Sequence, residues 1–184
     1  ADLALTGGTG GDVAGGTLAL GRTVGVTGAR IVAVADSAAG FSPARTGDAT
    51  GRFALPGLWD MHVHFGGGEA LIEENRNLLP LYVAHGITTV RDAAGDLSPS
   101  VLAWRRDVAA GTLQGPAIFT SGPKLEGINS VWPGDLEVGN EAEVRAALDR
   151  LQGLQVDFVK ITENTLTPAL YLSLIHIPEP TRPY

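Results

Sequence analysis

Two histidines spaced two residues apart are the side chains in this sequence best placed to do chemistry. His62 and His64 lie in a strand-like segment, residues 58–65. Because side chains of a strand alternate between its two faces, Asp60, His62 and His64 should project from one face. Two imidazoles so placed can bind one metal ion through one ring nitrogen each, and Asp60 could orient one of them. An H-x-H pair also arises by chance, so the spacing alone leaves metal binding open.

A lysine near the end of another strand-like run, residues 156–162, is the second candidate. Lys160 is unexpected there, because parallel strands buried on both faces are usually continuous apolar runs. Burial favours the neutral amine of a lysine, and a neutral amine can combine with carbon dioxide to give a carbamate whose oxygens can bridge two cations. The alternative is a lysine that extends its amine to the edge of the sheet.

Other polar residues are open to simpler interpretations. Asp92 ends the strand expected at 87–92, where its carboxylate could face the same site or cap the following turn. His85 ends a helical segment, and its interaction with the helix dipole explains it sufficiently. A loop over 122–140 carries three residues that could touch a substrate or simply be solvated: Lys124, Glu126 and Trp132.

The elements that must position these residues alternate along the chain from residue 55 onward. Strands are expected at 58–65, 87–92, 116–121 and 156–162, and helices at 69–84, 99–110 and 141–152. Four strands with three intervening helices indicate βαβ crossovers and therefore a parallel sheet. The carboxyl ends of parallel strands meet at one edge, which would bring His64, Asp92 and Lys160 together.

The first 55 residues have a different, glycine-rich texture. Short antiparallel strands are expected at 17–20, 23–26 and 30–35. The run Gly7–Gly11 is interpreted as a turn rather than a nucleotide-binding loop, because Val13 stands where the third glycine of G-x-G-x-x-G belongs.

Composition narrows the classes of function. The chain has 184 residues, a net charge of −7 and no cysteine. Disulfides and thiolate metal sites are therefore excluded, and the acidic balance disfavours nucleic-acid binding. No apolar run approaches the roughly 20 residues of a membrane-spanning helix, so no membrane partner is expected. Neither the compartment nor the oligomeric state can be inferred.

The segment from Gly51 to His64, together with Gly86–Asp92, resembles the amidohydrolase superfamily of metal-dependent hydrolases. The resemblance extends over residues 1–171. It is closest to the imidazolonepropionase-like and prolidase-like branch of that superfamily. In that family an H-x-H pair ends the first strand of a (β/α)8 barrel, and a carboxylated lysine on the fourth strand bridges two metal ions. The resemblance implies His62, His64 and Lys160 as metal ligands. It leaves Asp60 and Asp92 as candidates to support a ligand or touch substrate.

The fold implied is α/β: the N-terminal half of a (β/α)8 TIM barrel, residues 56–171, preceded by a partial β-sandwich, residues 1–55. Such a barrel takes about 250 residues, whereas only 114 lie between Leu58 and Tyr171. The family's two further histidines and its proton-transferring aspartate, from later strands, cannot be assigned. The chain is therefore expected to be an N-terminal part that is inactive as written.

The function implied is hydrolysis of a carbon–nitrogen bond, amide or peptide-like, by a metal-activated water, with a small-molecule substrate such as a dipeptide. Two zinc ions are expected, although manganese, cobalt or iron could substitute. One alternative is a mononuclear deaminase of the same superfamily, which would not need Lys160. Another is a barrel that binds small molecules without turnover.

The last 13 residues, 172–184, resemble the translated end of a sequencing adapter, with Pro178 where the usual translation has serine. On that interpretation they lie outside the fold and His176 is no ligand. The alternative is a genuine strand ended by Pro178.

Overall fold

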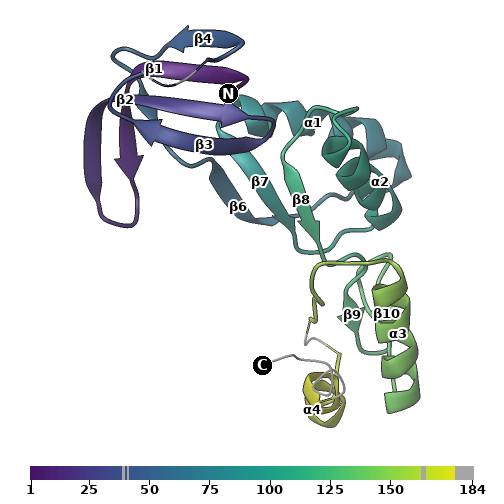
Figure 1. Ribbon diagram of the computed structural model, residues 1–184. Coiled ribbons are helices and arrows are strands. Elements are labelled where there is room, and N and C mark those ends of the chain that lie inside the picture. Colours follow the sequence, from purple (N-terminus) through teal and green to yellow (C-terminus); the bar gives the residue numbers. More distant parts are fainter. Residues whose placement is uncertain (39, 41, 163–164, 177–184) are drawn as a thin grey trace. The chain divides into compact units, whose positions relative to one another are not determined.

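The computed structural model describes residues 1–38, 40, 42–162 and 165–176. The chain divides into two compact units, Ala1–Pro56 and Gly57–Tyr184, which are described one after the other. It is a mixed α/β structure with several sheets (Figure 1).

The first unit is a five-stranded mixed sheet. Its strands are β1 (Leu3–Asp12), β2 (Thr17–Thr27), β3 (Arg30–Ala35), β4 (Arg45–Asp48) and β5 (Phe53–Ala54). The order is β3-β2-β1-β4, and β5 also pairs with β1. β1 pairs with β2 and β2 with β3 in antiparallel fashion, whereas β4 and β5 run parallel to β1. Of these pairings, only that of β2 with β3 was expected. The two short strands expected at 17–20 and 23–26 are one continuous strand.

The prediction of a turn at Gly7–Gly11 is wrong, because these residues lie within β1. The glycines permit an irregular strand: Gly7 has φ +74°, and the pairing with β2 shifts register on both sides of Gly8. Close packing adds to this at Gly8, where a Cβ would lie 3.2 Å from Cβ of Ala49. Their composition reflects bulges and close approach rather than a reversal of the chain.

The second unit begins with the βαβ pattern expected from the sequence. Strands β6 (Leu58–Val63), β7 (Ile87–Asp92) and β8 (Ala117–Thr120) form a parallel sheet in the order β6-β7-β8. A short 3-10 turn, η1 (Glu69–Leu71), and α1 (Ile72–Ala84) connect the first two strands, and α2 (Ser98–Ala109) connects the next two. The described residues do not close into a barrel.

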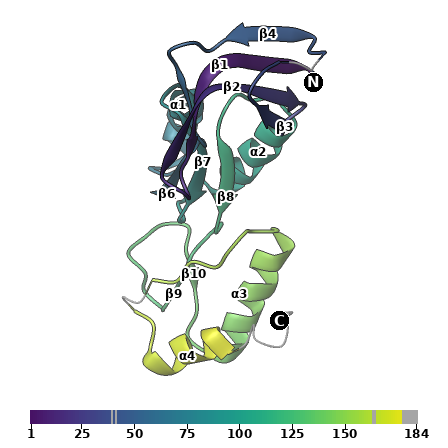
Figure 2. The same ribbon diagram turned by 60° about the vertical axis from the view of Figure 1, so that its left-hand side comes forward.

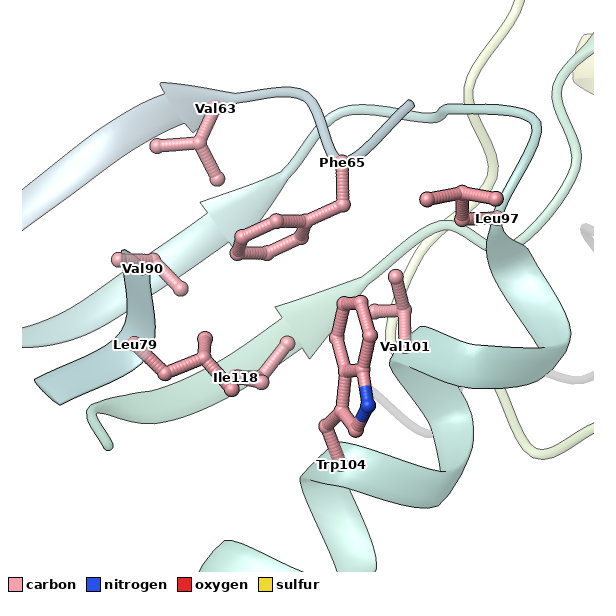
Figure 3. Close-up of a cluster of buried hydrophobic side chains, with 8 residues drawn as sticks. All are labelled: Val63, Phe65, Leu79, Val90, Leu97, Val101, Trp104 and Ile118. Carbon is pink, nitrogen blue, oxygen red and sulfur yellow. The ribbon is translucent and has the colours of Figure 1, made fainter. Parts of the chain in front are cut away.

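The apolar core of this sheet lies on the face covered by α1 and α2 (Figure 3). Its buried members come from the three strands, from both helices and from residues just after β6 and just before α2: Val63, Phe65, Leu79, Val90, Leu97, Val101, Trp104 and Ile118. The Phe65 ring packs edge-to-face on Trp104, with centroids 5.8 Å apart. Burying Val63 and Phe65 here turns the intervening His64 away from the core.

The strand expected at 156–162 is wrong as a regular element, because only Ile161 forms a bridge there, with Leu125. The Asp157 carboxylate accepts the Thr120 backbone N–H at 2.8 Å, so a side chain occupies a position that a ladder carbonyl would take. Arg105 of α2 binds the same carboxylate at 2.8 Å. These contacts hold the segment beside the end of β8 without a continuous ladder.

The remaining elements are β9 (Leu125–Glu126), β10 (Leu136–Glu137), α3 (Glu141–Gly153) and α4 (Pro168–His176). α3 was expected, and its Asn140 cap accepts the Glu143 N–H at 3.0 Å. α4 was not expected; it packs against α3 (Figure 2), where Ser173 donates to Glu141 at 3.0 Å. No described helix combines the length and apolar character that crossing a membrane requires.

The alternative of a strand over the segment that begins at residue 172 is wrong, because residues up to His176 form the helix α4. Leu174 is only 3% exposed and joins a second core cluster with residues of β9 and α3. Residues 177–184, with Pro178, lie outside the described residues, and the resemblance to an adapter stays a prediction.

Candidate metal site

The two histidines of the H-x-H pair converge at the carboxyl end of β6. The Nε2 atoms of His62 and His64 are 3.0 Å apart, and the ring planes meet at 62°. Two nitrogens bound about 2.0–2.1 Å from one zinc ion lie about 2.8–3.4 Å apart for bond angles from a right angle to tetrahedral. The pair therefore fits two neighbouring ligands of a single ion.

The described residues supply no third ligand of the usual kinds: no histidine, aspartate or glutamate among them completes a group of three around this pair. Lys160 is half-buried, and its backbone carbonyl accepts the Leu125 N–H at 2.8 Å. Among the contacts of the described residues, none joins its amine to either imidazole, so its role as a ligand stays a prediction.

His64 is oriented by the backbone of the loop after β7. Its Nδ1 forms a hydrogen bond with the carbonyl oxygen of Ala94. Ala94 is 4% exposed and has φ 83°, a left-handed conformation that costs a non-glycine residue about 1–2 kcal/mol. This partner was missed because a backbone acceptor carries no side-chain signal in a sequence.

Asp60 does not follow the alternation expected from the sequence. The pairing of β6 with β7 matches Asp60 to Val90 and then shifts by one residue before Val63. This bulge puts Asp60 on the side of Val90, which is buried under the helices. The Asp60 carboxylate accepts the backbone N–H of His62 at 3.1 Å, so Asp60 supports the main chain of His62 and not an imidazole ring.

Asp92 is fully buried at the end of β7. Its carboxylate accepts the Thr120 hydroxyl at 2.7 Å and the Phe65 N–H at 3.4 Å. Burial raises the pKa of Asp92, and the two hydrogen bonds and the nearby His64 only partly oppose it. Neither of these hydrogen bonds is to the turn that follows β7, so no capping contact is seen among the described residues, and as a buried carboxyl group near His64 Asp92 stays a candidate to support the site.

The loop after β8 is more ordered than a solvated loop would be. Lys124 pairs with Asp135, Nζ to Oδ2 at 3.4 Å, with side chains only 12% and 6% exposed. Its ammonium also lies 4.9 Å from the centre of the Trp132 ring. Lys124 therefore has a structural role in this chain, whereas Trp132 remains 57% exposed.

Glu126 is likewise structural. It is 1% exposed and accepts hydrogen bonds from the hydroxyl of Thr162 and from both the hydroxyl and the N–H of Thr165. Burial alone raises the pKa of Glu126, but these hydrogen bonds and the nearby Lys124 outweigh it, so the pKa is lowered. The carboxylate ties β9 to the segment before α4.

No family model and no curated protein matches the chain, but solved structures do. A protein proposed to be a prolidase, from Bifidobacterium longum, is 29% identical over 87% of this chain and 40% of its own, with a TM-score of 0.74. A structure described as an amidohydrolase is 25% identical over 86% of this chain and 46% of its own, with a TM-score of 0.64.

A third match is an Xaa-Pro dipeptidase with methionine bound in its active site. It is 20% identical over 97% of this chain and 54% of its own, with a TM-score of 0.78, a likeness of fold. The chain thus spans 40% to 54% of the length of these three proteins. The matches agree with the resemblance to the amidohydrolase superfamily found in the sequence, because the solved structures that the chain matches include a protein proposed to be a prolidase, an amidohydrolase and a dipeptidase.

Proposed function

We propose that this chain supplies the first ligands of a metal-dependent hydrolase that cleaves a carbon–nitrogen bond, amide or peptide-like, in a small-molecule substrate. The observation that carries the proposal is the 3.0 Å separation of the two Nε2 atoms. It is supported by the kind of protein that shares the fold, which includes a dipeptidase and an amidohydrolase. In this proposal residues 56–171 form half of a (β/α)8 barrel and residues 1–55 part of a β-sandwich.

Each residue of the site has a separate part in the proposal. His62 and His64 hold a divalent ion, with Ala94 and Asp60 fixing the ring and the main chain of the pair. When bound, such an ion activates a water molecule and polarises the scissile carbonyl group. The buried carboxyl group of Asp92 lies near His64, which partly opposes the rise in the pKa of Asp92 caused by burial. The donors suit zinc first, with manganese, cobalt or iron as substitutes.

Lys160 is proposed, from the family resemblance alone, to supply carbamate oxygens to a second ion. Its half-buried position, on a segment paired with β9, is compatible with that role. Replacing it in a protein that carries the remaining barrel strands separates the two forms of the hypothesis. Loss of one of two metal ions in Lys160→Ala supports a binuclear hydrolase, whereas one ion before and after supports the mononuclear alternative.

A direct test is to measure zinc binding by the untagged 184-residue chain. Calorimetry gives the affinity, and elemental analysis gives the number of zinc ions per chain. We expect about one zinc ion per chain, and His62→Ala or His64→Ala should weaken binding by at least about tenfold, because each removes a direct ligand. His85→Ala is the matched control, since it removes an imidazole at the end of α1 and should leave zinc binding unchanged. Equal affinities in all three variants would contradict the proposed site.

A further inference from the structure

The hydrogen bonds of the two imidazoles make them chemically different. A neutral imidazole carries one N–H, on either Nδ1 or Nε2. A carbonyl oxygen only accepts, so the His64 nitrogen bonded to Ala94, Nδ1, must carry the hydrogen. The Nε2 of His64 is then an acceptor, and the neighbouring Nε2 of His62, 3.0 Å away, must carry the hydrogen between them.

We propose that the loop after β7 presets His64 as its Nδ1–H tautomer, ready to bind a metal, whereas His62 must change tautomer when a metal binds. The second half of the statement rests on the proposed function. The change is a balanced proton shift: His62 loses the hydrogen on Nε2 to solvent and gains one on Nδ1. His62 is exposed, so water can carry both protons. His64 needs no such shift.

The loop can impose this preference because it is fastened to the chain on both sides of His64. The Ala93 N–H donates to the Val63 carbonyl at 2.9 Å, immediately before His64. On the other side, the Asp96 carboxylate accepts the N–H groups of Gly67 and Gly68 at 3.0 and 2.8 Å.

Backbone packing keeps the two loops in register. A Cβ on Gly95 would lie 2.0 Å from the Phe65 carbonyl oxygen, so the loop after β7 lies directly against the residue that follows His64. The Ala94 carbonyl is thus held at the Nδ1 atom of His64 by contacts that involve no metal. Asp96 is therefore a positioning residue for His64: it acts through the loop and touches neither ring.

The test is long-range proton–nitrogen NMR of the ¹⁵N-labelled 184-residue chain, metal-free, at a pH where the imidazoles are neutral. We expect the Nδ1–H pattern for His64 and the Nε2–H pattern for His62. His85 is an internal reference, because its Nδ1 bonds the Leu81 carbonyl at 2.8 Å and should also show the Nδ1–H pattern. An Nε2–H pattern for His64 would overturn the proposal.

Zinc titration of the same sample tests the second half. We expect His62 to change from Nε2–H to Nδ1–H while His64 keeps its hydrogen on Nδ1. A His64 that changes tautomer on binding zinc overturns the inference but leaves the proposed function standing. If His64 shows the Nδ1–H pattern and zinc alters neither ring, the proposed function fails and the predicted change in His62 is refuted. The positioning of His64 by the loop still stands in that case.

Asp96→Asn tests the positioning residue. It should convert the His64 signals to a mixture of tautomers and weaken zinc binding about 10- to 100-fold, the usual range for groups that orient a ligand, without altering His85. Asp12→Asn is the matched control, because Asp12 also accepts two successive N–H groups, those of Ala14 and Gly15 at 3.0 Å, in the first unit. Unchanged His64 signals in a folded Asp96→Asn chain would refute the role of Asp96. If that variant does not fold, the tautomers of the unmodified chain still decide the main proposal.

Discussion

At the scale of single residues, the buried carboxyl groups differ in how fully their surroundings compensate their charge. Lys124 and Asp135 pair in a nearly dry environment, and Glu126 has three donors from Thr162 and Thr165. Asp92 is compensated less fully, so its pKa is raised whereas that of Glu126 is lowered. The hydrogen bonds of Glu126 therefore favour its charged form and stabilise the fold. The burial of Asp92, near His64, works against its charge.

Glu126 gives the fold a dependence on pH. Because its folded-state pKa lies below the ordinary 4.5, the stability it contributes is full above that value and is lost as the pH falls through the lowered pKa. Glu126→Gln should lower the free energy of unfolding at pH 7 by about 1–3 kcal/mol, and the difference from the unmodified chain should shrink in acid. Denaturant unfolding at several pH values measures this. Glu74→Gln, on the exposed side of α1, should change little; equal effects of the two would contradict the assignment.

At the scale of elements, local sequence patterns predicted what local interactions determine. β7 has the expected bounds, and α1, α2 and α3 lie within one or two residues of theirs except at the start of α1, where the 3-10 turn intervenes. His62 and His64 also lie close together as expected, because they are two residues apart at the end of one short strand, β6. Patterns failed where distant contacts decide, as in β1, whose glycines resemble a turn until Leu55 and Ala49 are packed against them.

The site shows the same division. The H-x-H spacing identified the two imidazoles, but the bulge that displaces Asp60 depends on pairing with β7. The Ala94 carbonyl is a main-chain group that any residue would offer, so no pattern could point to it. The segment 156–162 has the composition of a strand, yet Asp157 and Arg105 bind each other from elements about 50 residues apart.

The packing of Gly95 on Phe65 can be tested at this scale. Gly95→Ala should destabilise the chain by about 1–3 kcal/mol, because its methyl group would meet the Phe65 carbonyl and the loop must move. Gly153→Ala is the control, since a Cβ there meets nothing within 4 Å at the end of α3 and should be neutral or slightly stabilising. Denaturant unfolding followed by circular dichroism compares them. A Gly95→Ala chain as stable as the control would show that the loops do not touch as described.

The Arg105 contacts make a second prediction about elements. Arg105→Ala should release residues 155–157, because the guanidinium holds both the Asp157 carboxylate and the Gln155 carbonyl, at 2.8 and 2.9 Å. Hydrogen exchange at residues 155–162 should quicken, whereas Arg106→Ala, an exposed neighbour on α2, should leave it unchanged. Unaltered exchange in Arg105→Ala would mean that the segment is held by other contacts.

At the scale of the whole molecule, the described residues hold the proposed metal-binding pair without a third ligand of the usual kinds beside it. The chain spans 40% to 54% of the length of the matched proteins. A large aromatic pair, Trp59 stacked on Phe119 at 5.1 Å, lies on the sheet with both rings substantially exposed. Metal binding and catalysis should therefore be separable in this chain.

The 184-residue chain should bind zinc, yet it should hydrolyse Xaa-Pro dipeptides no faster than zinc in buffer does. The two imidazoles position an ion, but no group that transfers a proton is assigned among the described residues. A continuous assay for released proline checks this, with the His62→Ala and His64→Ala double variant as the blank. Turnover that requires both histidines would show that the chain by itself holds a complete site.

The most direct measurement of the central claim is X-ray absorption spectroscopy at the zinc edge of the zinc-loaded chain. The account predicts two imidazole nitrogens at about 2.0–2.1 Å, with the imidazole scattering lost in parallel as His62 and His64 are replaced and retained when His85 is replaced. A zinc environment of oxygen ligands alone, or imidazole scattering that persists in the double variant, would contradict it.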